Sequence, residues 1–150
     1  MNIIGGELEI LARPVSGLEA GMGLGYTEGS FERYTDPMTK ANDAGKRVPY
    51  VPEYNWISHI QYQHSSGFMG RIEMEVVGES FYDEANTPSL RQAAYALAHG
   101  RIGYNTKYGG IYLFGRNLTD KLYYGFKSGV LTAGTVGEPR TFGIEGRINY

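Results

Sequence analysis

Apolar and polar residues alternate along most of this chain with a period of two, which is the pattern of β-strands. In the segment 18–27, leucine, alanine, methionine and tyrosine alternate with glutamate, glycine and threonine. Near His99 and Gly100 the phase slips, and a β-bulge is expected there. The pattern predicts about seven strands, at roughly 6–12, 18–27, 54–63, 68–77, 91–105, 111–123 and 141–150.

The connections between these strands are short and long in turn. Short turns are expected at 14–17, 65–67 and 106–110, and polar loops without a period at 28–51, 83–89 and 124–138. Outer-membrane β-barrels combine short periplasmic turns, long outer loops and tilted strands of about ten residues. The regular difference between the two strand ends therefore favours a transmembrane β-barrel wall.

The two faces of the predicted strands differ in chemistry. One is aliphatic and aromatic, and the other carries Glu, Arg, Gln, Asn, His and Gly, as expected for a lipid face and a wet lumen. Aromatic residues near strand ends suit the interfacial girdles of such barrels, namely Tyr26, Tyr54, Trp56, Tyr82 and Tyr150. A soluble antiparallel sheet with one buried face gives the same alternation, so that alternative stays open.

Composition narrows the function classes. The 150 residues include 22 Gly and 13 Tyr but no Cys, which excludes disulfide scaffolds, Cys-ligated metal and thiol catalysis. A formal net charge of −2 without a basic run argues against nucleic-acid binding. Neither a signal peptide nor an apolar stretch of about 20 residues, the length of a transmembrane helix, is visible.

Two segments near the end carry a family resemblance. Residues 117–123, Asn-Leu-Thr-Asp-Lys-Leu-Tyr, resemble the Asn-Leu-aromatic-Asp-x-x-Tyr segment of TonB-dependent outer-membrane receptors, with Thr119 in place of the aromatic residue. Residues 137–144 are similar to the Gly-x-Pro-Arg-x-Phe segment that opens the last strand of those barrels. The motif residues, which we expect to have structural roles, are Asn117, Leu118, Asp120, Tyr123, Gly137, Pro139, Arg140 and Phe142.

These motif residues also have physical interpretations of their own. Gly137 and Pro139 end a loop and fix the backbone, so that Arg140 enters the last strand with defined geometry. Asp120 is expected to anchor turn hydrogen bonds where the sixth strand leaves the sheet. Alternation to the final aromatic residue resembles the signal read by the barrel-assembly machinery, through Ile144, Ile148 and Tyr150, although Glu145 stands where that signal has Gly.

The resemblance implies a partial barrel. Receptors of this family have a plug domain and a TonB-contacting box, with a barrel of roughly 22 strands around the plug. Residues 1–150 are therefore expected to be the carboxyl-terminal portion of the barrel, without the plug, and to need the rest of the barrel. The implied function is uptake of a ferric siderophore or similar scarce ligand across the outer membrane, energised by TonB through the plug.

Candidate chemistry is sparse, and we predict no catalytic, metal or cofactor site. Gly21, Gly23 and Gly25 lie within a strand, so they do not form a phosphate loop. Ligand contact is expected from the loops 28–51, 83–89 and 124–138, because loops on a rigid wall carry recognition. Plausible contact residues there are Tyr34, Lys40, Lys46, Arg47, Tyr124 and Lys127. The alternatives are a small complete outer-membrane barrel with a structural or adhesion role, and a soluble ligand-binding β-barrel.

Overall fold

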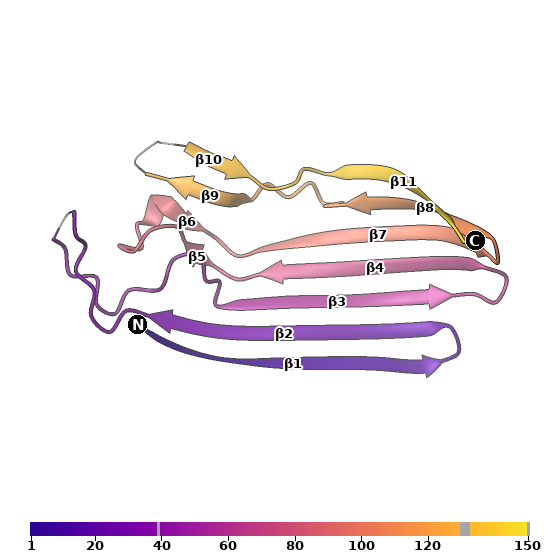
Figure 1. Cartoon of the computed structure of the whole chain (residues 1–150), viewed down its shortest axis with the longest axis horizontal. Coiled ribbons are helices and arrows are strands. Elements are labelled where there is room, and N and C mark those ends of the chain that lie inside the picture. The colour runs from indigo at the N-terminus through magenta and orange to yellow at the C-terminus, as the bar shows by residue number, and fades with distance from the viewer. Residues whose placement is uncertain (39, 130–132, 150) are drawn as a thin grey trace.

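The computed structural model describes residues 1–38, 40–129 and 133–149. Its main element is one antiparallel sheet of seven strands, in which strands that follow one another along the chain are paired (Figure 1). In sheet order the strands are β1 (Asn2–Val15), β2 (Leu18–Ser30), β3 (Tyr54–Gln63), β4 (Phe68–Val77), β7 (Tyr95–Thr106), β8 (Gly109–Arg116) and β11 (Thr141–Ile148). The predicted all-β fold and strand number are confirmed.

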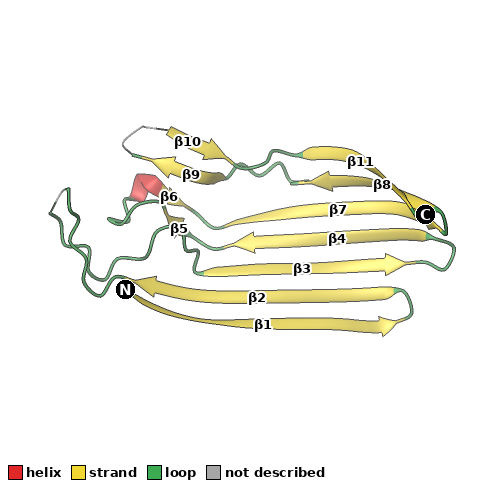
Figure 2. Cartoon of the chain, in the orientation of Figure 1, coloured by secondary structure: helices red, strands yellow, loops and turns green. Residues whose placement is uncertain are grey.

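Turns and loops lie at opposite ends of this sheet. Tight turns join β1 to β2, β3 to β4 and β7 to β8 at one end, and the long connections gather at the other (Figure 2). The long connections contain the remaining short elements: β5 (Ser80–Phe81), the 3₁₀ helix η1 (Pro88–Leu90), β6 (Arg91–Gln92), β9 (Tyr124–Ser128) and β10 (Ala133–Val136). The predicted segregation of short turns from long loops is therefore confirmed.

The strand register separates the side chains by chemistry, since paired residues share a face. Glu9 pairs with Gly23, Gly23 with Ile57, and Ile57 with Glu75. We call this side the polar face; it carries Glu7, Glu9, Glu19, Asn55, His59, Gln61, Arg71, Glu73, Glu75, His99, Arg101, Glu145 and Arg147. The apolar face carries Leu8, Ile10, Leu24, Trp56, Ile60, Ile72, Met74, Ile102, Leu113, Phe142 and Ile144.

The apolar face lies open along its length. Ile72 in the middle of β4 is 71% exposed, and Ile144 on β11 is 72% exposed. The buried apolar residues among the described ones are only Tyr82, Leu97 and Tyr112, because a single sheet has no second layer to pack on. A continuous exposed apolar surface of this kind is typical of a face that contacts a membrane or another protein surface.

No helix in the described part of the chain is long and apolar enough to cross a membrane.

Three predicted features of the fifth and sixth strands are wrong: the start of the fifth, its bulge near His99 and the end of the sixth. The fifth starts at Tyr95 rather than residue 91, and it pairs with β4 from Val77–Tyr95 to Phe68–Tyr104 without a bulge at His99. The sixth ends at Arg116 rather than near residue 123. The sixth strand ends at Arg116 because Asn117 and Asp120, with φ angles of 45° and 54°, turn the chain away from an extended path.

Two further boundaries differ from the predictions. β1 spans Asn2–Val15, and the turn predicted over 14–17 shrinks to Ser16 and Gly17, where the glycine has φ 81°. The register of β1 shifts between Ala12 and Val15, around Pro14, which lacks a backbone donor. The loop predicted over 124–138 contains the hairpin β9–β10, which is paired from Ala133–Ser128 to Val136–Tyr124.

Candidate functional site

The two motif segments meet where β8 and β11 join the outer loops. We call this contact region, formed by residues 117–123 and 137–142, the motif junction; its two chain segments run past each other in Figure 1. Asn117 is 2% exposed, and its Nδ2 donates to the carbonyls of Lys121 at 3.0 Å and Glu138 at 2.9 Å. Its Oδ1 accepts from the Lys121 amide at 2.8 Å. One amide side chain thus fixes both segments.

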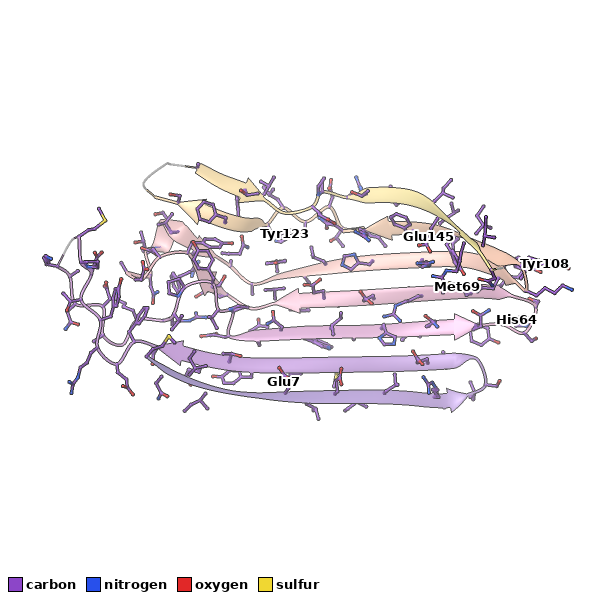
Figure 3. The ribbon with its side chains drawn as sticks, viewed as in Figure 1. Glu7, His64, Met69, Tyr108, Tyr123 and Glu145 are labelled. Atoms are coloured by element: carbon purple, nitrogen blue, oxygen red, sulfur yellow. The ribbon has the colours of Figure 1, made fainter. Side chains whose placement is uncertain are left out.

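Other motif residues contact one another across the same junction. The Arg140 amide donates to Asp120 Oδ1 at 3.2 Å, and the two side chains form an ion pair at 3.5 Å. The Gly137 amide donates to the Tyr123 carbonyl at 2.8 Å. The ring of Tyr123, which is labelled in Figure 3, lies against Gly137. A Cβ on Gly137 would be 2.0 Å from Tyr123 Cζ, so only glycine fits beneath this ring.

Leu118 closes the junction on the apolar side. Its amide donates to the Ala98 carbonyl at 2.8 Å, and its side chain covers the adjacent glycines Gly100 and Gly115. A Cβ on Gly115 would meet Leu118 Cδ2 at 2.5 Å and the Phe142 ring at 2.9 Å. Leu118 and Phe142 therefore pack over a notch that glycine leaves in the sheet.

Two residues of the predicted assembly signal, Ile144 and Ile148, lie on β11. Ile144 and Ile148 are 72% and 82% exposed, and β11 is paired with β8 on one side only in this chain. Tyr150 lies outside the described residues.

At the loop end, the connection 31–53 is fastened to the connection 78–94. The Arg47 amide donates to Asn86 Oδ1 at 2.7 Å, and Asn86 Nδ2 donates back to the Arg47 carbonyl at 3.0 Å. The Arg47 guanidinium forms ion pairs with Glu53 at 3.3 Å and Glu79 at 3.4 Å. We call this arrangement of Arg47, Asn86, Glu53 and Glu79 the loop clasp.

A cluster of three aromatic side chains, Tyr50, Tyr82 and Phe126, links these two connections to the hairpin β9–β10. The rings of Tyr50 and Phe126 are stacked at 6.5 Å, and Tyr82 lies 5.5 Å from Tyr50. The Tyr82 hydroxyl donates to the Tyr124 carbonyl, and the Tyr124 amide donates to Gln92 Oε1 at 2.9 Å. Burial raises the pKa of Tyr82 above its ordinary value. The three outer connections thus form one bonded layer.

The loop residues predicted as ligand contacts are mostly engaged within this layer. Lys46 Nζ donates to the Ala85 carbonyl at 2.9 Å, and Lys127 Nζ donates to the Arg91 carbonyl at 2.8 Å. Arg47 belongs to the loop clasp. Tyr34 stacks on Phe31 at 4.7 Å, and burial raises the pKa of its hydroxyl. The contacts of Lys46, Arg47 and Lys127 are with neighbouring loops, whereas Tyr34 packs within its own loop. A role of these residues in ligand binding stays a prediction.

Asn86, Tyr82 and Gln92 hold the loops together, and sequence reasoning missed that role for all three. Asn86 has φ 53°, a conformation that asparagine tolerates, so its place in a polar loop was a usable turn signal. Its contact with Arg47, 39 residues away, has no local signature.

On the polar face, charged side chains pair within the sheet near the turn end. Arg13 contacts Glu19 at 2.7 Å, Arg71 contacts Glu73 at 2.6 Å, and Arg101 contacts Glu145 at 3.0 Å. Among the described residues, no group of three or more His, Asp or Glu side chains has the spacing of a metal site.

Comparison with known proteins was made by sequence and by structure. No family model matches the sequence. Over 115 residues the chain is 32% identical to the pesticin receptor of Yersinia pestis, a match that covers 71% of this chain and 16% of that protein. The pesticin receptor of Yersinia enterocolitica matches with the same identity and coverage. The chain thus spans only 16% of the length of these curated relatives.

Solved structures of similar fold cover nearly the whole chain. The ferric yersiniabactin uptake receptor of Yersinia pestis superposes with a TM-score of 0.82 and 26% identity, over 99% of this chain and 23% of that chain. The closed form of the ferric-catecholate import receptor of E. coli K12 superposes with a TM-score of 0.77 over 96% of this chain and 20% of that chain. At 20% identity, the second match shows the fold alone.

Proposed function

We propose, from the premise that this chain belongs to the TonB-dependent outer-membrane receptors, that residues 1–150 are a carboxyl-terminal portion of a receptor's barrel wall. The receptor would take up a ferric siderophore or a similar scarce ligand across the outer membrane. This chain would supply the wall and part of the outer loops, while a plug domain elsewhere in the receptor would contact TonB.

The observation that carries the proposal is the two-faced meander. Its apolar face is exposed, its polar face bears paired charges, and its turns and loops lie at opposite ends. Closed barrels in lipid need this arrangement, because every backbone group must be paired and alternate side chains meet lipid and water. The superposition on the ferric yersiniabactin receptor, over 99% of this chain, supports the same proposal.

The partners follow from the surfaces. Outer-membrane lipid would cover the apolar face, and the outer edges of β1 and β11 would pair with the rest of the barrel, since both are edge strands here. The polar face would line the lumen and contact the plug. The barrel-assembly machinery would recognise Ile144, Ile148 and Tyr150. The motif junction would stabilise the ends of β8 and β11 where they lead into the loops.

The test is an exchange of segments. Residues 1–150 replace the matching segment of the ferric yersiniabactin receptor of Yersinia pestis, and uptake of ⁵⁵Fe-yersiniabactin is measured in cells with and without TonB. A matched chimera keeps the relative's loops in place of 28–51, 83–89 and 124–138, which separates wall from loops. We expect both chimeras to assemble, shown by mobility that changes on heating, and the loop-retaining one to support TonB-dependent uptake. Assembled chimeras without such uptake would contradict the proposed function.

A further inference from the structure

The polar face contains a cavity directly beneath the motif junction. It has a volume of about 250 Å³ and is lined by Arg71, Glu73, His99, Arg101, Arg116 and Glu145, with Phe114 as its apolar wall. Glu145 is labelled in Figure 3. His99 connects the cavity to the motif junction, because the backbone amide of Asn117 donates to His99 Nδ1 at 3.4 Å. We call this cavity the arginine basin.

Both glutamates of the basin already form ion pairs with arginines. Arg71 holds Glu73 at 2.6 Å, while Glu145 is shared by Arg101 at 3.0 Å and Arg147 at 3.5 Å. Arg116 has a weaker partner, Glu138, at 3.7 Å, and both of these side chains are exposed. Three arginines therefore line the basin against two glutamates, each of which is already bound to an arginine.

Hydrogen-bond donors also exceed acceptors there. Arg101 donates through one terminal nitrogen to Glu145, and its guanidinium lies 4.0 Å from the centre of the Tyr112 ring. Its Nε is buried and has no hydrogen-bond partner within the described residues. Buried donors normally have an acceptor, so the basin lacks one.

We propose that the arginine basin binds a carboxylate group. Guanidinium forks match carboxylates in charge and in the spacing of their donors, and Phe114 offers an apolar surface to an alkyl stem. The proposal rests on the proposed function only in that the polar face must line the barrel interior. The carboxylate has two possible sources: an acidic side chain of the segment that fills the barrel, or a small carboxylate solute in the lumen.

Single cysteines can report on the basin, since the chain has no native cysteine. Phe114→Cys places a thiol in the basin, and Ile57→Cys places a matched one on the same face between Glu9 and Glu75. Each variant of the full receptor, in isolated outer membranes, is labelled with thiosulfonates bearing either a sulfonate or a trimethylammonium group. The ratio of the two rates on one cysteine cancels the thiol's own reactivity.

Two results support the proposal and identify the source. In the first result, the sulfonate reagent labels Phe114→Cys about tenfold faster than the trimethylammonium reagent, and the preference is reversed at Ile57→Cys. Sodium glutarate also slows labelling of Phe114→Cys. This result means that the carboxylate comes from solution. If neither reagent reacts until Arg71→Gln and Arg116→Gln are added, the carboxylate belongs to the segment that fills the barrel. Arg33→Gln, on an exposed loop, is the control and leaves either result unchanged.

The proposal is overturned if both reagents label Phe114→Cys equally and glutarate has no effect. It is also overturned if the cysteine stays blocked after both arginines are replaced. Labelling needs an assembled barrel but no uptake, so a receptor that fails the uptake test can still show whether the basin binds a carboxylate.

Discussion

At the scale of single residues, the buried side-chain amide of Asn117 organises the place where β8 and β11 lead into the loops. Asn117 turns the chain with a positive φ and bonds both segments of the motif junction. Asparagine suits this position because it tolerates the left-handed conformation and has both donor and acceptor atoms. Asn117 therefore both ends the strand β8 and holds the two loop segments together.

Replacing Asn117 by alanine should destabilise the junction. The change removes three hydrogen bonds at a site that is 2% exposed, and we expect a loss of about 2 kcal/mol. The measurement is the free energy of unfolding of the full receptor in urea. Asn149→Ala, at an exposed position near the opposite end, should change it little; equal effects of the two substitutions would contradict the assigned contacts.

Two glycines give a second residue-scale prediction. Gly137→Ala would place a Cβ 2.0 Å from the Tyr123 ring, whereas Gly146→Ala meets nothing within 4 Å. We expect Gly137→Ala to displace Tyr123 from its stack on Tyr95, whose ring centre lies 4.5 Å away, and to lower stability by about 1–3 kcal/mol. Near-ultraviolet circular dichroism and urea unfolding would show both changes. A neutral Gly137→Ala would mean that the ring does not pack there.

At the scale of elements, the outer connections behave as one layer rather than as separate loops. The loop clasp joins 31–53 to 78–94, and the group of Tyr82 and Tyr124 joins 78–94 to the hairpin β9–β10. Lys46 and Lys127, two of the predicted ligand contacts, donate hydrogen bonds between these connections, and their role in ligand binding stays a prediction. Ligand contact through this layer would therefore involve several loops moving together.

The loop clasp predicts a local change in hydrogen exchange. Asn86→Ala removes the acceptor of the Arg47 amide, and exchange at this amide should become about tenfold faster, the effect of losing one net hydrogen bond. Asn42→Ala is the control, because Asn42 accepts from Ala44 within its own loop. Exchange that stays unchanged at Arg47 in the Asn86→Ala receptor would show that the two loops are held by other contacts.

At the scale of the whole molecule, the proposed function accounts for the open surfaces of the sheet. Within the described residues its apolar face is open, and its edge strands β1 and β11 are each paired on one side. Each unpaired edge group is costly in lipid, so in the proposed barrel the chain would pair with neighbouring strands as well as contact the bilayer.

One pair of substitutions tests which face meets lipid. Ile72→Arg puts a charge on the apolar face in the middle of β4, where it should cost about 2–4 kcal/mol in a bilayer. Ile57→Arg puts the same charge on the polar face, beside Glu75, where water and a carboxylate receive it. We expect Ile72→Arg alone to reduce the amount of heat-modifiable receptor in outer membranes. The reverse result would exchange the two faces.

The sequence by itself determined the seven strands of the main sheet and their two faces, but not the hairpin β9–β10 inside the loop predicted over 124–138. Alternation with a period of two sorts every side chain in a strand, so the seven-stranded meander, its short turns and its long loops could be predicted. Glycine and proline marked the turns because their backbone preferences are local. The end of the sixth strand was predicted too late, since the positive φ of Asn117 is supported by Glu138, a residue of the other motif.

Only the tertiary structure decided which distant residues meet. The contact between Asn117 and Glu138, the loop clasp and the arginine basin each join residues from separate strands or loops. No period or composition encodes such pairings, because they depend on the register and curvature of the assembled sheet. The carbonyl partners of Lys46 and Lys127 have the same origin, because a side chain's contacts are set by what the fold places beside it.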